Sequence, residues 1–362
     1  MVAVAFSAVT KEHGGHAVLR SLTLDVDDGT ICCLIGPSGC GKSTALRLLA
    51  GLDEPTAGDI RIGRRRVNDV PTRQRGLGMV TQSTTLLLRR PTEDSIGLPL
   101  DLRPDIDADE RRRRIEEQAL ALDIGALLQR PASTLSGGEA QIAQVARAVI
   151  ARPDVLLLDE PLARIDPARR SVVRADLVRL QALYGVTTLW VTADQSDALA
   201  VAQRVAVLID GRLEQAGTPM DVYLRPGTLA VARFVGEPEV GVLRARVDHG
   251  TATLDAGGAR WPVPAAALRQ LTTEYVDVAV RPHDLAAAGP AAPAGVGLAG
   301  RVTGVELTGR AAVATVAVPD GVLRWDGAPV GIRSGDEVRL VVDPGRVHLF
   351  DPASGVALWH PE

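Results

Sequence analysis

The residues best suited to chemistry form a glycine-rich stretch, GPSGCGKST, which follows an apolar run and precedes a helix-like segment. Glycines let backbone N–H groups approach phosphate oxygens, and a helix that starts there directs its positive end at them. A lysine in the stretch would neutralise phosphate charge, and the next serine would hold Mg²⁺. The pattern therefore predicts a nucleotide phosphate site rather than an empty strand-to-helix turn. Its residues are Gly36, Pro37, Ser38, Gly39, Cys40, Gly41, Lys42, Ser43 and Thr44.

Two carboxylates, Asp159 and Glu160, directly follow the apolar strand-like run 155–158. At the end of a strand, a carboxylate can meet Mg²⁺ on phosphates carried by a neighbouring strand-end loop. Asp159 would hold the metal, and Glu160 would polarise the attacking water as a general base, a role worth about 10²–10⁴-fold in rate. An isolated Asp-Glu pair could equally form a salt bridge or a cap. The upstream phosphate loop favours catalysis.

A second anion site is predicted where the sequence LSGGE opens a helix with apolar residues at helical spacing. Backbone N–H groups and the helix dipole would again favour negative charge at this point. Because the chain carries two such sites, we expect that one nucleotide is shared between them. The residues are Ser136, Gly137, Gly138 and Glu139.

The elements that must position these residues change in kind along the chain. Strands alternate with helices up to about residue 235, which predicts a mainly parallel sheet covered by helices, with a helical subdomain at about residues 85–150. Beyond residue 236, short alternating apolar runs follow one another every ten or so residues, which is typical of a small all-β barrel. A chain of 362 residues fits two domains, predicted here as 1–235 and 236–362.

Composition excludes several classes of protein. The net charge of −4 and an aromatic content of 3% argue against a nucleic-acid partner. Three cysteines show no metal-ligand spacing, and five histidines downstream of residue 15 show no paired spacing for a metal, so we expect isolated solvent or turn histidines.

No window reaches the roughly twenty apolar residues that span a bilayer, so any membrane role is expected to come through a partner. Tryptophans in the tail are expected to fill its core or edge rather than bind sugar.

The three motifs, in this order and spacing, resemble the ATP-binding subunit of ABC transporters. The resemblance implies an α/β P-loop NTPase fold with a helical subdomain, and ATP and Mg²⁺ as cofactors. It implies a head-to-tail homodimer in which the LSGGE sequence of each subunit, called the signature, caps ATP on the other subunit. It also implies two multispanning membrane permease subunits, an extracytoplasmic solute-binding protein, and a position on the cytoplasmic face of the cell membrane. The tail looks like the OB-like accessory β-barrel of maltose- and glycerol-phosphate-type importers, which favours carbohydrate import.

The resemblance extends to three further positions. Gln82 stands where the family's glutamine contacts Mg²⁺ and assists catalysis, and Asp166 matches the loop that crosses the dimer interface. His13 stands where an aromatic residue usually stacks on adenine, and an imidazole can also stack.

The sequence also departs from the family pattern. Ala193 replaces the switch histidine that contacts the γ-phosphate, and Ala140 and Ile142 stand where basic residues are common. Losing one hydrogen-bond donor to developing phosphate charge typically costs about 10²–10³-fold in kcat. Three functions stay open: a slow or differently assisted transport ATPase, a nucleotide-gated subunit with little hydrolysis, and a soluble ABC ATPase without a transporter.

Overall fold

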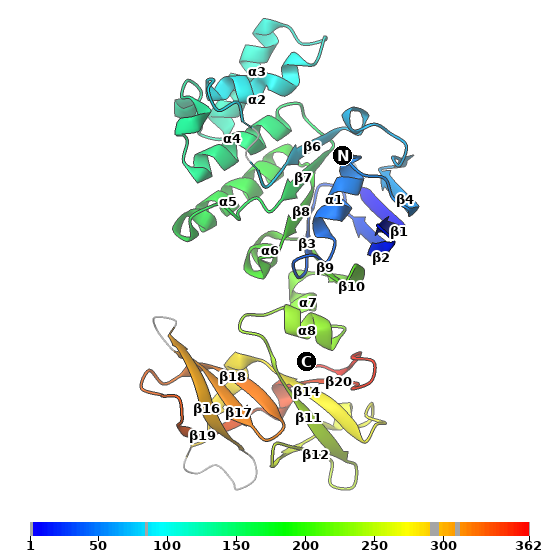
Figure 1. Cartoon of the computed structure of the whole chain (residues 1–362), viewed down its shortest axis with the longest axis vertical. Helices are drawn as coiled ribbons and strands as arrows, with labels where there is room; N and C mark the ends of the chain where they lie inside the picture. The colour runs from blue at the N-terminus through cyan, green and yellow to red at the C-terminus, as the bar shows by residue number, and fades with distance from the viewer. Residues whose placement is uncertain (1–2, 84–85, 290–296, 308–311, 362) are drawn as a thin grey trace. The chain divides into compact units, whose positions relative to one another are not determined.

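The computed structural model describes residues 3–83, 86–289, 297–307 and 312–361. The chain forms two compact units, Met1–Pro219 and Met220–Glu362 (Figure 1). The predicted boundary lay later, after residue 235. Segment 220–235 groups with the second unit because the Arg281 guanidinium of that unit donates hydrogen bonds to the carbonyl oxygens of Tyr223, Ala232 and Val235.

A six-stranded sheet forms the centre of the first unit, in the order β10-β9-β3-β8-β7-β6. All neighbouring pairs are parallel except β9 and β10, which form a hairpin. The middle strands β3, β7 and β8 are buried along almost their whole length, as expected for parallel strands covered on both faces. Their bounds are β3 (Ile31–Ile35), β6 (Leu77–Val80), β7 (Val155–Asp159), β8 (Thr187–Thr192), β9 (Arg204–Ile209) and β10 (Arg212–Gly217).

Helices cover this sheet, and α1 lies between it and a second, antiparallel sheet of order β2-β1-β4-β5 (Figure 1). Apolar side chains from both sheets and from α1 form one core. This packing fixes the start of α1 at the end of β3. The bounds are β1 (Val4–His13), β2 (His16–Val26), β4 (Ala57–Ile62), β5 (Arg65–Arg66), α1 (Lys42–Ala50), α5 (Pro167–Tyr184), α6 (Gln195–Val201) and the 3₁₀ helix η1 (Thr72–Gln74).

The predicted helical subdomain contains α2 (Thr92–Asp101), α3 (Ala108–Ala121), η2 (Gly125–Leu127), η3 (Ala132–Thr134) and α4 (Gly137–Val149). Helix α4 has the strongest apolar face of this group and packs against the β6 edge, where a Cβ at Gly78 would come within 2.3 Å of the Ala148 carbonyl oxygen. This contact holds the C-terminal end of α4 against the same sheet that carries the phosphate loop. Among the described residues, no helix is long and apolar enough to cross a bilayer.

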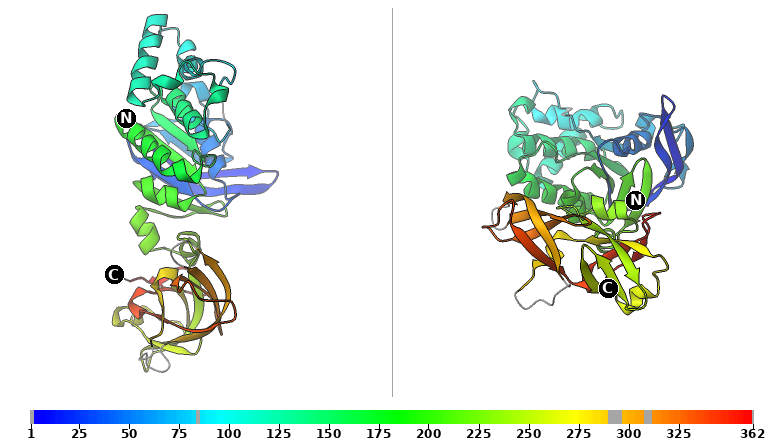
Figure 2. Two further views of the ribbon diagram at one scale, coloured as in Figure 1. Left: turned by 90° about the vertical axis from the view of Figure 1, so that its left-hand side faces the viewer. Right: turned by 60° about the horizontal axis from the view of Figure 1, so that its bottom comes forward.

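The second unit is the predicted all-β barrel (Figure 2). Two antiparallel sheets, β13-β12-β11-β14-β20-β21 and β15-β19-β16-β17-β18, enclose one apolar core that contains Trp261 and Trp325. The two sheets also approach each other where β11 begins, since a Cβ at Gly241 would lie 2.4 Å from the Leu323 side chain of β18. Both tryptophans thus have the predicted core role.

The strands of the barrel are β11 (Gly241–Asp248), β12 (Thr253–Ala256), β13 (Ala259–Pro262), β14 (Tyr275–Val280), β15 (Leu285–Ala287), β16 (Leu298–Leu307), β17 (Ala312–Val318), β18 (Gly321–Ala328), β19 (Glu337–Val342), β20 (His348–Phe350) and β21 (Ala357–Trp359). Its helices are α7 (Pro219–Leu224), α8 (Leu229–Phe234), α9 (Ala265–Leu268), η4 (Pro282–Asp284) and η5 (Pro344–Arg346).

Candidate active site

Three neighbouring parallel strands carry the predicted catalytic residues at their carboxyl ends. In the register of the sheet, Ile35 of β3 pairs with Thr192 of β8, and Asp159 of β7 pairs with Val191 of β8. The phosphate loop, residue 193 and Glu160 therefore leave adjacent strands at one edge of the sheet, which is where ligands of open α/β sheets bind. Residues separated by more than 100 positions in the sequence meet because of this topology.

The phosphate loop leaves the first turn of α1 open to an anion. Gly41 occupies the N-cap position in the left-handed region (φ 106°), and within the described chain no side chain caps the helix. A Cβ at Gly41 would lie 2.7 Å from the Leu19 side chain and 2.8 Å from the Val18 carbonyl oxygen. A glycine is thus required both by the backbone angle and by the close neighbours. The unpaired N–H groups of α1 match the predicted phosphate site.

Lys42 lies in the mouth of this loop. Its Nζ donates hydrogen bonds to the carbonyl oxygens of Gly36 (2.8 Å) and Pro37 (3.0 Å), and the residue is only 7% exposed. Neutral carbonyls compensate a buried ammonium poorly, so phosphate oxygens would be stronger acceptors for it. The loop therefore holds a positive charge at the point where the sequence predicts the β- and γ-phosphates.

Ser43 and Asp159 bring two oxygen ligands together beside Lys42. The Ser43 hydroxyl donates to Asp159 Oδ1 at 3.2 Å, and burial raises the pKa of the Asp159 carboxyl. A hydroxyl and a carboxylate next to a phosphate loop form the donor set that Mg²⁺ takes together with substrate phosphates. The residues at this position fit the predicted metal.

Glu160 is held on the neighbouring strand end. Its Oε1 accepts the backbone N–H of Ala193 at 2.9 Å, and its Oε2 accepts the Thr192 hydroxyl at 3.3 Å. Burial, the largest influence, raises the pKa of the Glu160 carboxyl. The residue itself adopts a left-handed backbone conformation (φ 48°), which is uncommon for a non-glycine residue and frequent at active sites. Thr192 was not predicted, since a threonine within an apolar strand carries no distinct signal.

The remaining predicted residues lie around this edge. Asp166 is the N-cap of α5 and accepts the Ala168 N–H at 2.9 Å. Gln82 follows β6 and is exposed, and His13 is exposed in the β1–β2 hairpin. Their assigned roles remain predictions.

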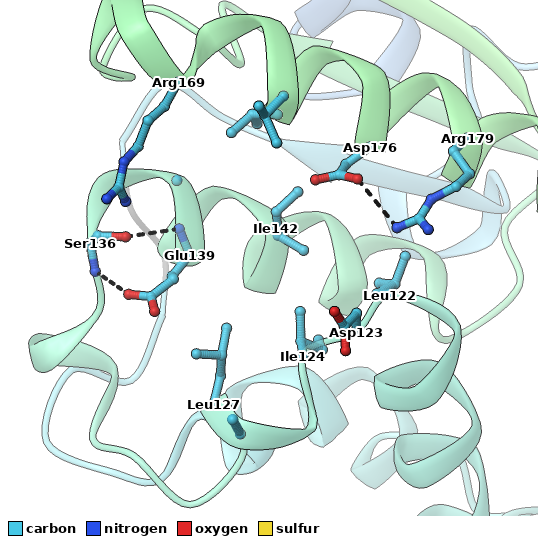
Figure 3. Close-up of a pocket in the computed structure, with 14 residues that line it drawn as sticks. Leu122, Asp123, Ile124, Leu127, Ser136, Glu139, Ile142, Arg169, Asp176 and Arg179 are labelled. Carbon is cyan, nitrogen blue, oxygen red and sulfur yellow. Dashed lines mark hydrogen bonds and ion pairs between the residues drawn. The ribbon is translucent and has the colours of Figure 1, made fainter.

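The second predicted anion site, at the start of α4, has its own intramolecular cap. The Glu139 N–H donates to the Ser136 hydroxyl (3.3 Å), and the Ser136 N–H donates to Glu139 Oε2 (2.7 Å), a reciprocal capping box (Figure 3). Arg130 adds an ion pair to Glu139 at 3.0 Å. The Glu139 carboxylate is thus engaged within the chain, and the N–H groups of Gly137 and Gly138 are the part of the turn left for a ligand.

Two family descriptions match the chain. Residues 19–163 match the "ABC transporter" family, and residues 278–350 match the "TOBE domain" family. The sn-glycerol-3-phosphate import ATP-binding protein UgpC of Cereibacter sphaeroides is 38% identical over 98% of this chain and 99% of its own length. The sulfoquinovosyl glycerol transport ATP-binding protein SmoE of Agrobacterium fabrum is 36% identical, over 97% and 98%.

A solved dimeric structure of MJ0796, a bacterial ABC transporter cassette, is similar to 60% of this chain and 98% of its own, with a TM-score of 0.53 and 28% identity. The chain belongs to the ATP-binding subunits of ABC transporters. It is an ABC transporter ATPase that carries a TOBE domain, and it is related to importers of carbohydrates and glycerol 3-phosphate.

The signature region of this ABC ATPase also borders a pocket of about 470 Å³ (Figure 3). Ile142 contributes to its apolar wall, at one of the two positions where the family commonly has a basic residue. Arg169 of α5 points toward the Ser136 end of α4. A cation therefore does lie beside the signature, but it comes from a different helix than the family pattern suggests.

The prediction of isolated histidines was wrong for one pair. His348 of β20 and His360 place their Nδ1 atoms 2.9 Å apart, although twelve residues separate them in sequence. His348 is 3% exposed, and burial lowers its pKa to about 3. Pairing of β20 with β21 brings the two imidazoles together, a tertiary effect that residue spacing does not reveal.

Proposed function

We propose that this protein is the ATP-hydrolysing subunit that powers import of a small solute, a sugar or a glycerol-phosphate type compound, by an ABC transporter. The observation that carries the proposal is the convergence of Lys42, Ser43, Asp159 and Glu160 at one sheet edge. Names of the similar proteins support the solute class, since these relatives are described as import proteins for glycerol 3-phosphate and for sugars such as xylose and arabinose.

In the proposed reaction, the open N-terminus of α1 and Lys42 bind the phosphates of the substrate ATP. Ser43 and Asp159 would hold Mg²⁺, with Gln82 as a further ligand, and the metal would neutralise charge that develops on the phosphates. Glu160 accepts a proton from the attacking water. Because burial raises its pKa, Glu160 is a stronger base than an exposed glutamate, and the acid limb of kcat is expected above the usual glutamate range.

The same proposal includes a dimer. The capped start of α4 leaves two glycine N–H groups for an anion, which suits a site completed by ATP on the phosphate loop of a second copy. His13 would stack on adenine, and Asp166 would cross the interface. Two membrane-spanning permease subunits and an extracytoplasmic solute-binding protein would complete the transporter at the cytoplasmic face of the membrane.

An alternative proposal is a nucleotide-gated subunit with little hydrolysis, and the methyl group of Ala193 favours it. The hydrogen bonds that Glu160 accepts from the Ala193 N–H and the Thr192 hydroxyl support hydrolysis instead. These donors orient the base without a switch histidine. A non-transport ABC ATPase is the third alternative, and copurification of a permease from detergent-solubilised membranes would exclude it.

Replacement of the general base tests the proposal. Glu160→Gln keeps the shape but not the proton acceptor, so kcat should fall by about 10²–10⁴-fold while ATP still binds and the dimer persists. Steady-state ATPase assays and size-exclusion chromatography with ATP measure the two effects. Glu116→Gln, an exposed glutamate on α3, is the matched control. Unchanged turnover in Glu160→Gln would remove Glu160 from the mechanism.

A further inference from the structure

A pocket of about 290 Å³ lies between the helical subdomain and the C-terminal end of α5. The C-terminal half of α3 forms one wall, and residues that follow α4 or end α5 form the other. None of these residues takes part in the ATP hydrolysis proposed above. The polar lining residues are Arg114, Glu117, Gln118, Arg152 and Tyr184.

Gln118 contributes a buried donor that lacks an acceptor. The residue is 5% exposed, and its Oε1 accepts the Tyr184 hydroxyl at 2.8 Å. Its Nε2 has no hydrogen-bond partner among the described residues. Most buried polar groups in proteins are paired, because a donor left without an acceptor is destabilising. An acceptor group on a ligand in the pocket would satisfy this amide.

The charges around the pocket leave one cation without an acid. Glu110 pairs with Arg113 at 2.6 Å and with Arg114 at 2.7 Å. Glu117, the one acid among the described lining residues, pairs with Arg113 as well. Arg152 is exposed and forms no ion pair within the part of the chain that the structure describes. Its guanidinium is therefore the charge available to a ligand, and this favours an anion.

Tyr184 connects this cation with the buried amide. Its hydroxyl donates to Gln118, and although burial raises the pKa of Tyr184, the charge of Arg152 acts in the opposite direction. The guanidinium thus lies near the hydroxyl that holds the amide in place. A carboxylate has two acceptor oxygens, so one group can accept hydrogen bonds from both Gln118 and Arg152.

The rest of the lining is apolar and consists of Ala121, Ile150 and Leu183. Ile150 is buried, whereas Leu183 is 59% exposed and leaves apolar surface open to a ligand. One unpaired cation beside an apolar wall suits a monoanion that carries a short hydrocarbon group better than it suits phosphate. The volume lies just below the roughly 300–1,000 Å³ of sites for drug-sized ligands, so the pocket fits a small metabolite rather than a nucleotide.

We propose that this pocket binds a small organic monocarboxylate with a short apolar body. The carboxylate accepts hydrogen bonds from Gln118 Nε2 and from the Arg152 guanidinium, and the apolar body covers Ile150 and Leu183. Because the walls belong to the helical subdomain and to α5, a bound acid would hold these two parts together. Any effect on ATP turnover rests on the proposed function, whereas binding itself requires no nucleotide.

A fluorine NMR titration with trifluorobutyrate tests the proposal. The full chain would carry Lys42→Ala, so that the phosphate loop does not contribute, and potassium chloride would hold the ionic strength constant. We expect saturable binding that weakens about tenfold in Arg152→Gln and in Gln118→Met, since each variant loses a donor to the carboxylate. Arg112→Gln is the matched control, because Arg112 is an exposed arginine of α3 that pairs with Asp109 outside the pocket.

A variant with the opposite expected sign separates charge from damage to the fold. Glu117→Gln removes the acid of the pocket with little change of shape and frees Arg113, so trifluorobutyrate should bind about twofold more tightly. Trifluorobutanol, the neutral analogue, should show no saturable binding. Absence of saturable trifluorobutyrate binding, equal binding of trifluorobutanol, equal weakening in Arg112→Gln, or no gain in Glu117→Gln would overturn the proposal. Displacement by inorganic phosphate at lower concentration than by butyrate would also overturn it.

Discussion

Helices α1 and α4 both begin at glycine-rich sequences, yet their first turns are satisfied in different ways. At α1 the N-cap is Gly41, and within the described chain no side chain accepts from the helix N–H groups. At α4 the Ser136 hydroxyl and the Glu139 carboxylate close a capping box. An uncapped N-terminus offers its full partial positive charge to an external anion, whereas a capped one has already been partly neutralised by its own carboxylate.

From this difference we expect the two helices to contribute unequally to the binding of one nucleotide. The α1 end, where the Lys42 ammonium is buried, is expected to bind phosphate by itself. The α4 end combines a negative Glu139 with two glycine N–H groups, so it should bind an anion only when another surface presents it. The same capping box would thus stabilise the start of α4 and weaken the anion site that we propose there.

The largest effect on ATP affinity is expected at the α1 end. Lys42→Ala removes charge-assisted hydrogen bonds worth about 3 kcal/mol, so ATP affinity should fall about 150-fold. Titration with a fluorescent ATP analogue measures this loss. Lys11→Ala removes the other lysine of the sequence, which donates to the Glu54 carbonyl oxygen, and serves as the control. Equal affinity in Lys42→Ala and wild type would mean that α1 is no stronger an anion site than α4.

A smaller effect is expected from restoring a donor at residue 193. Ala193→His adds one hydrogen bond to the γ-phosphate in the transition state, so kcat should rise about tenfold. Steady-state ATPase assays measure the gain, and Ala193→Phe adds a ring without a donor as the control. If kcat of both variants equals that of wild type, no donor is missing at residue 193. The Ala193 N–H would then already support hydrolysis through its hydrogen bond to Glu160.

Much of this site could be predicted because its motifs are local. The lysine, serine and glycines of the phosphate loop are consecutive, and an apolar strand marks the position of Asp159. Two-residue alternation likewise predicted short strands beyond residue 236, and β14, β17 and β19 are among the strands observed there. Shorter strands such as β12, β20 and β21 were not predicted, because three or four residues carry too little periodicity to separate from a turn.

Contacts between distant segments could not be predicted. Thr192 binds Glu160 across two strands, and the sequence contains no spacing that links them. Arg169 of α5 points toward the start of α4 (Figure 3). Positions 140 and 142, which follow the LSGGE sequence, are not basic, so a search of those positions alone misses this cation. The histidine pair of the barrel depends on strand pairing in the same way.

A third prediction concerns the cap of α4. Glu139→Gln keeps the hydrogen-bonding shape but removes a charge that favours the helix N-terminus, which should cost about 0.5 kcal/mol at pH 7. Hydrogen bonding, first to the Ser136 N–H, lowers the pKa of Glu139, so its stabilisation is present above the ordinary glutamate pKa and is lost as the pH falls through the lowered value. Urea denaturation at pH 7 and at pH 3 should show the difference disappearing in acid.

The smallest effect, with the opposite sign, is expected for Asp159→Asn. Burial raises the pKa of Asp159, which means that its carboxylate is penalised in the folded state above the ordinary aspartate pKa. The amide removes that penalty and can still accept the Ser43 hydroxyl. Without nucleotide or metal, the variant should therefore be slightly more stable than wild type at pH 7 in urea denaturation, and the gain should shrink as the pH falls through the raised pKa.

A loss of stability at pH 7 would show that the Asp159 carboxylate stabilises the folded state, as the Glu139 carboxylate is expected to do. The predicted gain would show that the α1 end keeps a destabilising charge for its ligand.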